Sequence, residues 1–103
     1  MSAPPDQLLN LRAQINQLDE QLIEVLGERF EISRLIGEFK RKTGLPALDE
    51  AREAAIMENR TALAMEYGLD RDFAHRFMQM ILDQVVAEHQ EISQYKSPPR
   101  GRA

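Results

Sequence analysis

The chain has 103 residues, the length of one small domain, and it contains no cysteine. Disulfides, metal–thiolate sites and thiol chemistry are therefore excluded. The formal net charge of -4 argues against a general nucleic-acid binder, because such proteins present basic surfaces to the phosphates, although a local basic pocket inside an acidic shell is still compatible with it. We therefore expect a small-molecule partner.

The two ends of the chain bear on its location and domain organisation. The first six residues carry neither the basic start nor the apolar run of a signal peptide, and no later stretch is long and apolar enough to span a bilayer. We therefore expect a cytoplasmic protein with no membrane partner. Residues 96–103 contain two prolines, a glycine and no apolar anchor, which predicts a disordered tail after a single domain over residues 1–95.

A very long helix is predicted from about Asp6 to Lys42. Its apolar residues recur in alternating steps of three and four, the spacing of a seam along which two helices pack lengthwise. Gly44 and Pro46 follow the helix, and they predict its end because glycine suits a left-handed cap and proline cannot continue a helix. The seam positions are Leu8, Leu11, Ile15, Leu18, Leu22, Val25, Arg29, Ile32, Ile36 and Phe39.

Two shorter helices are predicted over roughly Glu50–Glu66 and Arg71–Gln94. Gly68 suits the left-handed end of the first, and Asp70 can cap the free amides of the second. With no strand-like alternation anywhere, the sequence predicts an all-α fold of three helices. The apolar face of the last helix, expected to be mostly core, contains Phe73, Phe77, Met80, Ile81 and Val85, with Met78 and Leu82 as further candidates.

The length of the first helix predicts an intertwined homodimer. About 36 residues at 1.5 Å each reach roughly 54 Å, whereas a compact domain of this size is only about 26 Å across. Folding the two shorter helices back onto it would leave much of the seam in water. So large an exposed apolar stripe usually marks an interface, here with a second copy of the chain.

Arg29 occupies an apolar position of this seam. Burying a guanidinium costs several kcal/mol unless an anion or several hydrogen-bond acceptors contact it. One interpretation is therefore that Arg29 pairs with a glutamate of a neighbouring helix or extends to the solvent-exposed edge of the seam. The alternative is that it binds an anionic ligand. Lys40 lies about three turns on and roughly 16 Å along the same face, so both can contact one ligand. Arg12 is about 25 Å from Arg29 and reaches that ligand only from the partner of an antiparallel dimer.

The second and third helices add further candidates. Asp49 is placed to cap the second helix, and Glu53 lies one turn later. One interpretation is plain capping with Arg52 and Glu53 in solvent, and the other is that Glu53 accepts a hydrogen bond from a ligand hydroxyl. His89 follows Val85 by four residues, and it is either a buried core or edge residue or a hydrogen-bond donor into the cationic pocket.

Taken together, these residues resemble the all-helical bacterial chorismate mutases. The resemblance covers about Leu8 to Gln90 and includes a helical third segment. It implies an intertwined dimer of three-helix chains that rearranges chorismate to prephenate, for aromatic amino acid biosynthesis, without a metal or organic cofactor. The matching positions are Leu11, Arg12, Ile15, Leu18, Asp19, Glu28, Arg29, Gly37, Lys40, Pro46, Asp49, Arg52 and Glu53.

The same resemblance implies a role for each polar residue. Arg29 and Arg12 of the partner subunit would bind the two carboxylates of the substrate. Lys40 would contact a carboxylate and the ether oxygen, and Glu53 would accept a hydrogen bond from the ring hydroxyl. Such fixed cations suit a reaction in which negative charge builds on the ether oxygen, since they bind the transition state more tightly than the substrate.

Four further positions complete the expected pocket, and two of them depart from the family pattern. Asp49 and Arg52 match the family. Val85 stands where a serine is common, and His89 replaces the glutamine or glutamate that usually faces the ether oxygen. We expect His89 to donate a hydrogen bond to that oxygen.

Other functions remain open at this point. The same scaffold resembles isochorismate pyruvate lyases and mutases that act on amino analogues of chorismate. Glu53 favours chorismate, because the Glu53 carboxylate can accept a hydrogen bond from the substrate hydroxyl. The resemblance suggests that the lyases have an apolar residue at this position. Val85 and His89 leave the choice of substrate open. A helical dimer module without catalysis, in which Arg29 pairs with a seam glutamate, is a further alternative.

Overall fold

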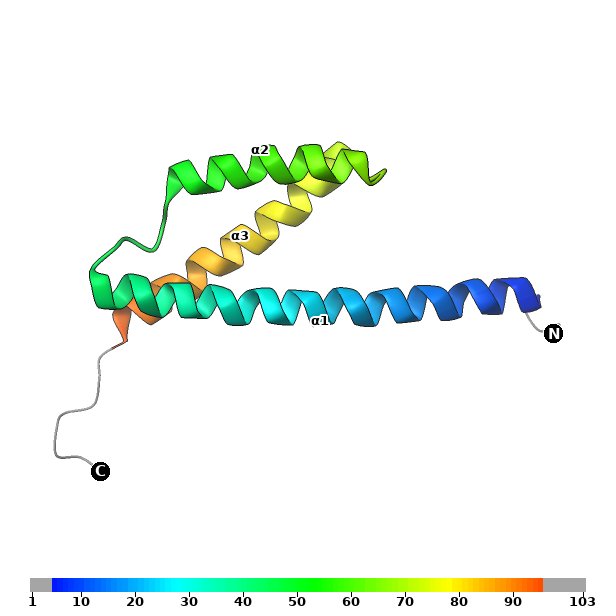
Figure 1. Ribbon diagram of the computed structural model, residues 1–103, viewed down its shortest axis with the longest axis horizontal. Helices are drawn as coiled ribbons and strands as arrows, with labels where there is room; N and C mark the ends of the chain where they lie inside the picture. The colour runs from blue at the N-terminus through cyan, green and yellow to red at the C-terminus, as the bar shows by residue number, and fades with distance from the viewer. Residues whose placement is uncertain (1–4, 96–103) are drawn as a thin grey trace, which may run out of the picture. The chain divides into compact units, whose positions relative to one another are not determined.

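The computed structural model describes residues 5–95, which contain three α-helices and no strand (Figure 1). Helix α1 spans Asp6–Thr43, α2 spans Glu50–Glu66 and α3 spans Arg71–Gln94. The predicted all-α fold is confirmed over this range, the bounds of α2 and α3 are those predicted, and α1 ends one residue after the predicted Lys42. The disordered tail predicted for residues 96–103 lies outside the described residues, as do residues 1–4.

The chain divides into two compact units, Met1–Ile32 and Ser33–Ala103. The first contains most of α1, and none of its described residues, 5–32, is buried. The second contains the last turns of α1, residues 33–43, together with α2 and α3. All the buried residues of the described chain belong to this second unit, so its core is also the core of the described protein.

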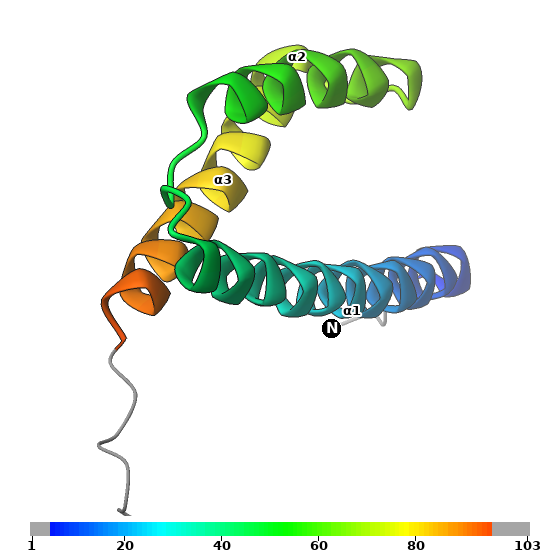
Figure 2. The same cartoon turned by 60° about the vertical axis from the view of Figure 1, so that its left-hand side comes forward.

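The core of the second unit lies where α2 and α3 pack together. The two helices meet at the turn around Gly68, and α3 then carries its C-terminal half to the last turns of α1 (Figures 1 and 2). The buried apolar residues are Ile56, Ala74, Ile81 and Leu82. Burial of these side chains is the main favourable term that holds α2 and α3 together.

Two residues of the predicted core on α3 are exposed instead. Phe73 is 48% and Met80 71% exposed, whereas Ala74 and Ile81 are buried. Each exposed residue precedes a buried one by a single position, which is a rotation of about 100° around the helix. The expected apolar face was therefore too wide, and the part centred on Ala74 and Ile81 is the part that packs.

Glycines end α1 and α2 in the same way. Gly44 and Gly68 have φ of 74° and 80°, values that favour glycine because a side chain there clashes with the backbone. After Gly44, the Leu45 N–H donates to the carbonyl of Lys40 at 2.9 Å. An equivalent bond of 3.0 Å closes the end of α2. Both predicted helix ends are thus confirmed, and the first fixes the backbone of Lys40.

Aspartates begin α2 and α3. The Asp49 carboxylate accepts a hydrogen bond from the backbone N–H of Arg52 at 3.0 Å, and the Asp70 carboxylate accepts one from Phe73 at 2.9 Å. Each satisfies an amide that the helix itself leaves free. Among the described residues, every helix is too short or too polar to serve as a membrane span.

Candidate active site

The predicted site residues fall into both units. Arg12, exposed, and Arg29, half-buried, belong to the first unit. The other six belong to the second unit, so the arrangement of the site is described for these: Lys40, Asp49, Arg52, Glu53, Val85 and His89.

Lys40 contacts a backbone carbonyl and an imidazole ring. Its ammonium donates to the carbonyl of Ala47 at 3.1 Å and lies 3.5 Å from Nδ1 of His89. Within residues 5–95 no carboxylate forms an ion pair with Lys40, although the side chain is half-buried. In this part of the chain its positive charge therefore has no carboxylate partner.

The next residue on α1 shows the contrast. The guanidinium of Arg41 forms an ion pair with Glu38 at 3.0 Å and lies 5.7 Å from the centre of the Tyr95 ring. Both partners stabilise its charge. Of these two neighbouring cations, only Lys40 is without an anionic partner among the described residues.

A pocket of about 420 Å³ opens beside Lys40, at the connection between α1 and α2. This volume lies in the range of small-molecule sites. Asp49 lies in its wall, with the carboxylate that caps α2. The structure therefore brings Lys40 and Asp49 together at one cavity, whose other lining residues are Leu45, Pro46, Leu48 and Glu50.

Four other predicted residues of the second unit, His89 among them, do not line this pocket. Arg52 is exposed and Glu53 half-buried on the first turn of α2, and Val85 is half-buried on α3. The capping interpretation of Asp49 is confirmed by its bond to the amide of Arg52. A ligand role for Arg52, Glu53 and Val85 stays a prediction.

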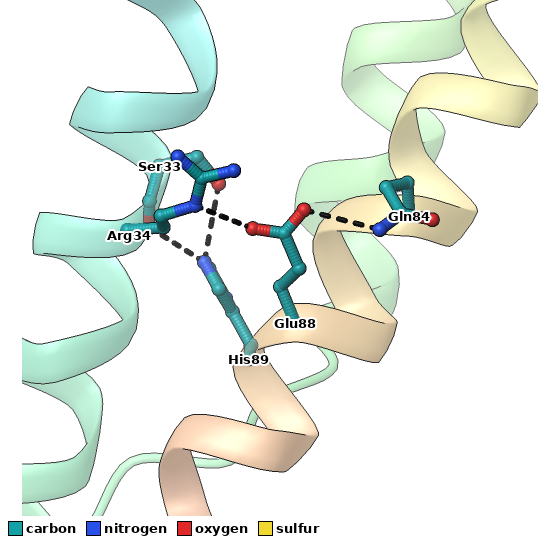
Figure 3. A network of polar contacts seen from close by, with 5 residues as sticks. All are labelled: Ser33, Arg34, Gln84, Glu88 and His89. Atoms are coloured by element: carbon teal, nitrogen blue, oxygen red, sulfur yellow. Dashed lines mark hydrogen bonds and ion pairs between the residues drawn. The ribbon is translucent and has the colours of Figure 1, made fainter.

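His89 is buried, with only 3% of its surface exposed, and its ring is fixed against α1. Its Nε2 lies 2.7 Å from the backbone carbonyl oxygen of Ser33 and 3.2 Å from the Ser33 hydroxyl (Figure 3). The interpretation of His89 as a buried residue of the third helix is confirmed, and a role as hydrogen-bond donor to a ligand remains a prediction.

His89 has two close neighbours on α1: Ser33, for which no role was predicted, and Gly37, which matched the family pattern but for which no contact was predicted. A Cβ atom at Gly37 would lie 2.8 Å from Cδ2 of His89 and 2.9 Å from Cδ1 of Ile92, so only glycine leaves room for the ring. Ser33, Gly37 and Lys40 are spaced by four and three residues and share one face of α1. That spacing was the one signal in the sequence for this contact face.

An ion pair lies next to this contact and joins the same two helices. Arg34 donates to the Glu88 carboxylate at 2.7 Å, and the Gln84 amide donates to its other oxygen at 3.1 Å (Figure 3). These hydrogen bonds, that of Arg34 first, lower the pKa of Glu88 below its ordinary value, because they stabilise the charged form.

The pocket beside Lys40 is lined by one cation, Lys40, and by the two acidic residues Asp49 and Glu50. Within residues 5–95, no group of three or more histidine, aspartate or glutamate side chains is placed to hold a metal ion. In a comparison with known families, the model of the family described as chorismate mutase type II matches residues 11–90. The chain belongs to the type II chorismate mutase family.

Relatives of this chorismate mutase family member include bifunctional proteins and a chorismate mutase of similar length. The bifunctional chorismate mutase/prephenate dehydratase of Escherichia coli K12 is 33% identical over 84% of this chain, and that of Enterobacter agglomerans 31% identical over 88%. The chain spans only 22% and 24% of the length of these two proteins. The chorismate mutase of Methanocaldococcus jannaschii is 23% identical, over 76% of this chain and 79% of its own length.

The Arg34–Glu88 pair makes the stability of this chorismate mutase family member depend on pH. Because the pKa of Glu88 is lowered from 4.5 in the folded chain, the pair stabilises that chain above pH 4.5 and this contribution is lost as the pH falls through the lowered pKa. Glu88→Gln should reduce the free energy of unfolding at neutral pH by about 1 kcal/mol or less, since Arg34 is largely exposed. Urea unfolding at fixed protein concentration measures this.

The matched control is Glu91→Gln, which removes an exposed carboxylate of the same helix that forms no ion pair among residues 5–95. We expect the difference between wild type and Glu88→Gln to shrink as the medium is acidified, and Glu91→Gln to show little difference throughout. A Glu88→Gln difference that stays constant into strong acid contradicts the assignment.

Proposed function

We propose that the chain is a chorismate mutase, an isomerase that rearranges chorismate to prephenate for the biosynthesis of phenylalanine and tyrosine. Family membership and the relatives named chorismate mutase support this activity. The observation that carries the proposal is the half-buried ammonium of Lys40, beside a pocket of about 420 Å³ and without a carboxylate partner in the described residues. Such a cation is suited to an anionic substrate.

The donors of Lys40 suggest how it acts. An ammonium has three N–H groups, and two of them are directed to the carbonyl of Ala47 and to His89. The third is left for a substrate oxygen. In the rearrangement the carbon–oxygen bond breaks ahead of carbon–carbon bond formation, so negative charge builds on the ether oxygen, and a cation already fixed beside it stabilises the transition state more than the substrate.

The arginines supply binding and orientation. In the proposed complex, Arg29 and Arg12 of the partner subunit each hold one carboxylate of the substrate, because the planar guanidinium can donate two parallel hydrogen bonds to a carboxylate. This clamp holds the flexible side chain of the substrate over its ring and so removes entropy from the barrier. The rearrangement then needs no acid, base or nucleophile.

Residues on the first turn of α2 and on α3 complete the proposed pocket. Glu53, half-buried, accepts a hydrogen bond from the ring hydroxyl, which favours chorismate over the substrates of the related lyases. Asp49 holds the start of α2 in place through its cap, and Arg52 and Val85 form the remaining wall. No cofactor has a part in this mechanism.

The proposed enzyme is a homodimer wrapped along the seam of α1. All nine apolar seam residues are exposed in the single chain, from 38% for Leu8 to 60% for Val25, Ile32 and Phe39. An exposed apolar stripe of this extent is typical of a protein–protein interface. In a homodimer, the stripes of the two chains would bury each other. The full set of exposed seam residues is Leu8, Leu11, Ile15, Leu18, Leu22, Val25, Ile32, Ile36 and Phe39.

The role of Lys40 is tested with a matched pair of lysine variants. Lys40→Ala should lower kcat/KM for chorismate by about 10²-fold or more, because it removes the cation at the ether oxygen. Lys42→Ala removes the same charge from an exposed position two residues away and should leave the rate close to wild type. The loss of chorismate absorbance gives both rates.

The same assay separates the alternative functions. Consumption of isochorismate with release of pyruvate, or of an amino analogue in preference to chorismate, would assign the chain to one of those activities. No turnover of any of the three by a folded dimer would favour a helical module without catalysis. Equal effects of the two lysine substitutions would remove Lys40 from the mechanism.

Sharing of Arg12 between subunits is tested by mixing two inactive variants. Arg12→Ala and Lys40→Ala chains, unfolded together in equal amounts and refolded, should form heterodimers in half of the molecules, each with one intact site of two. Activity should therefore return to about a quarter of the wild-type value. If mixing restores no activity although heterodimers form, Arg12 acts within its own chain; an Arg12→Ala variant that is active on its own would show that Arg12 has no role.

A further inference from the structure

His89 and Lys40 meet at a contact whose protonation is determined by its partners. The carbonyl oxygen of Ser33 can only accept a hydrogen bond, so the Nε2 atom that lies 2.7 Å from it carries a proton. The ammonium of Lys40 can only donate, so the Nδ1 atom that lies 3.5 Å from it is bare. One form of the ring satisfies both contacts, the neutral imidazole with its proton on Nε2.

The ring has no freedom to take another orientation. On the α1 side it lies against the backbone at Gly37, where even a Cβ atom would come within 2.8 Å of Cδ2 and 3.2 Å of Nε2. The ring is buried, and Ile92 of α3 fills the space beside it. A ring flip would exchange Nδ1 with a carbon atom and leave both Ser33 and Lys40 without their partner.

The charged neighbours of the ring are few. From α1 it faces Lys40, and from α3 it adjoins Glu88, whose carboxylate is already bound by Arg34 and Gln84 (Figure 3). No carboxylate of the described residues is hydrogen-bonded to the ring itself. A proton on Nδ1 would remove the acceptor that faces the ammonium of Lys40.

We propose that His89 is a positioning residue: its neutral ring accepts a hydrogen bond from Lys40 at Nδ1 and thereby directs the free N–H of that ammonium into the pocket. This role differs from the donor role expected from the sequence, because the only N–H of the neutral ring is donated to Ser33. The consequence for catalysis rests on the proposed function, whereas the contact itself does not.

The contact is tested by nitrogen NMR of the folded protein. The chain has two histidines, so the His75→Gln variant leaves His89 as the single imidazole. We expect a protonated Nε2 and a bare Nδ1 at neutral pH. Lys40→Met should move the Nδ1 resonance and Lys42→Met should leave it in place. A proton on Nδ1, or no response to Lys40→Met, overturns the proposal.

The consequence for the reaction is tested by two substitutions, to Asn and to Gln, each of which keeps one of the two hydrogen-bonding functions of the ring. The Asn oxygen replaces Nδ1 and keeps an acceptor for Lys40, whereas the Gln amide replaces Nε2 and keeps only the donor to Ser33. We expect His89→Asn to retain kcat/KM within a few-fold of wild type and His89→Gln to lose about tenfold, mainly in kcat, because the ammonium is then misplaced. Thermal unfolding checks that both variants are folded.

The outcomes separate this proposal from the proposed function. If wild type turns over chorismate and His89→Gln is as active as His89→Asn or more so, the substrate-donor role holds and the positioning role is wrong. If wild type turns over no chorismate, the proposed function fails, and the NMR measurement still decides whether His89 accepts from Lys40.

Discussion

The contacts of the half-buried Lys40 ammonium with the carbonyl of Ala47 and with the His89 ring are the interactions on which the rest of the site depends. A charge in such surroundings is usually neutralised by a carboxylate of the same protein, as Glu38 does for Arg41 one residue away. At Lys40 that compensation is absent from residues 5–95. The pocket beside Lys40 provides the space in which the proposed anionic ligand would meet this charge.

The local fold serves to hold this one side chain. The left-handed backbone at Gly44 turns the chain so that Leu45 binds the carbonyl of Lys40 and Ala47 receives its ammonium. The absence of a side chain at Gly37 lets the His89 ring lie against α1. A donor that is fixed before the substrate binds lowers the activation free energy, because it does not have to be reoriented during the reaction.

Sequence reasoning located the helix ends and the burial of His89, because these follow from local signals. Gly68, Asp49 and Asp70 each act on neighbouring backbone groups, and their residue types reveal that action. It missed the contacts of His89 with Ser33 and of Lys40 with Ala47, because both acceptors are backbone carbonyls, which every residue possesses. It also missed the pairing of Arg34 with Glu88, two surface charges 54 positions apart that no periodicity connects.

Apolar periodicity was a partial guide to packing. On α3 it selected Ile81 correctly, but it also included Phe73 and Met80, because residue type cannot distinguish a face that packs within the chain from one that does not. On α1 the same periodicity identified nine apolar residues that the single chain leaves exposed. The placement of Arg12 and Arg29 at a shared site follows from the resemblance and remains a prediction.

The most direct test of the central claim is the affinity of the folded protein for prephenate, the dicarboxylate product, measured by titration calorimetry on wild type and on Lys40→Met. If the Lys40 ammonium is held for an anionic ligand, wild type should bind prephenate and the variant should bind it about tenfold or more weakly, with loss of a charge-assisted hydrogen bond. Equal affinity of the two proteins, or no binding by a folded wild type, would contradict the account.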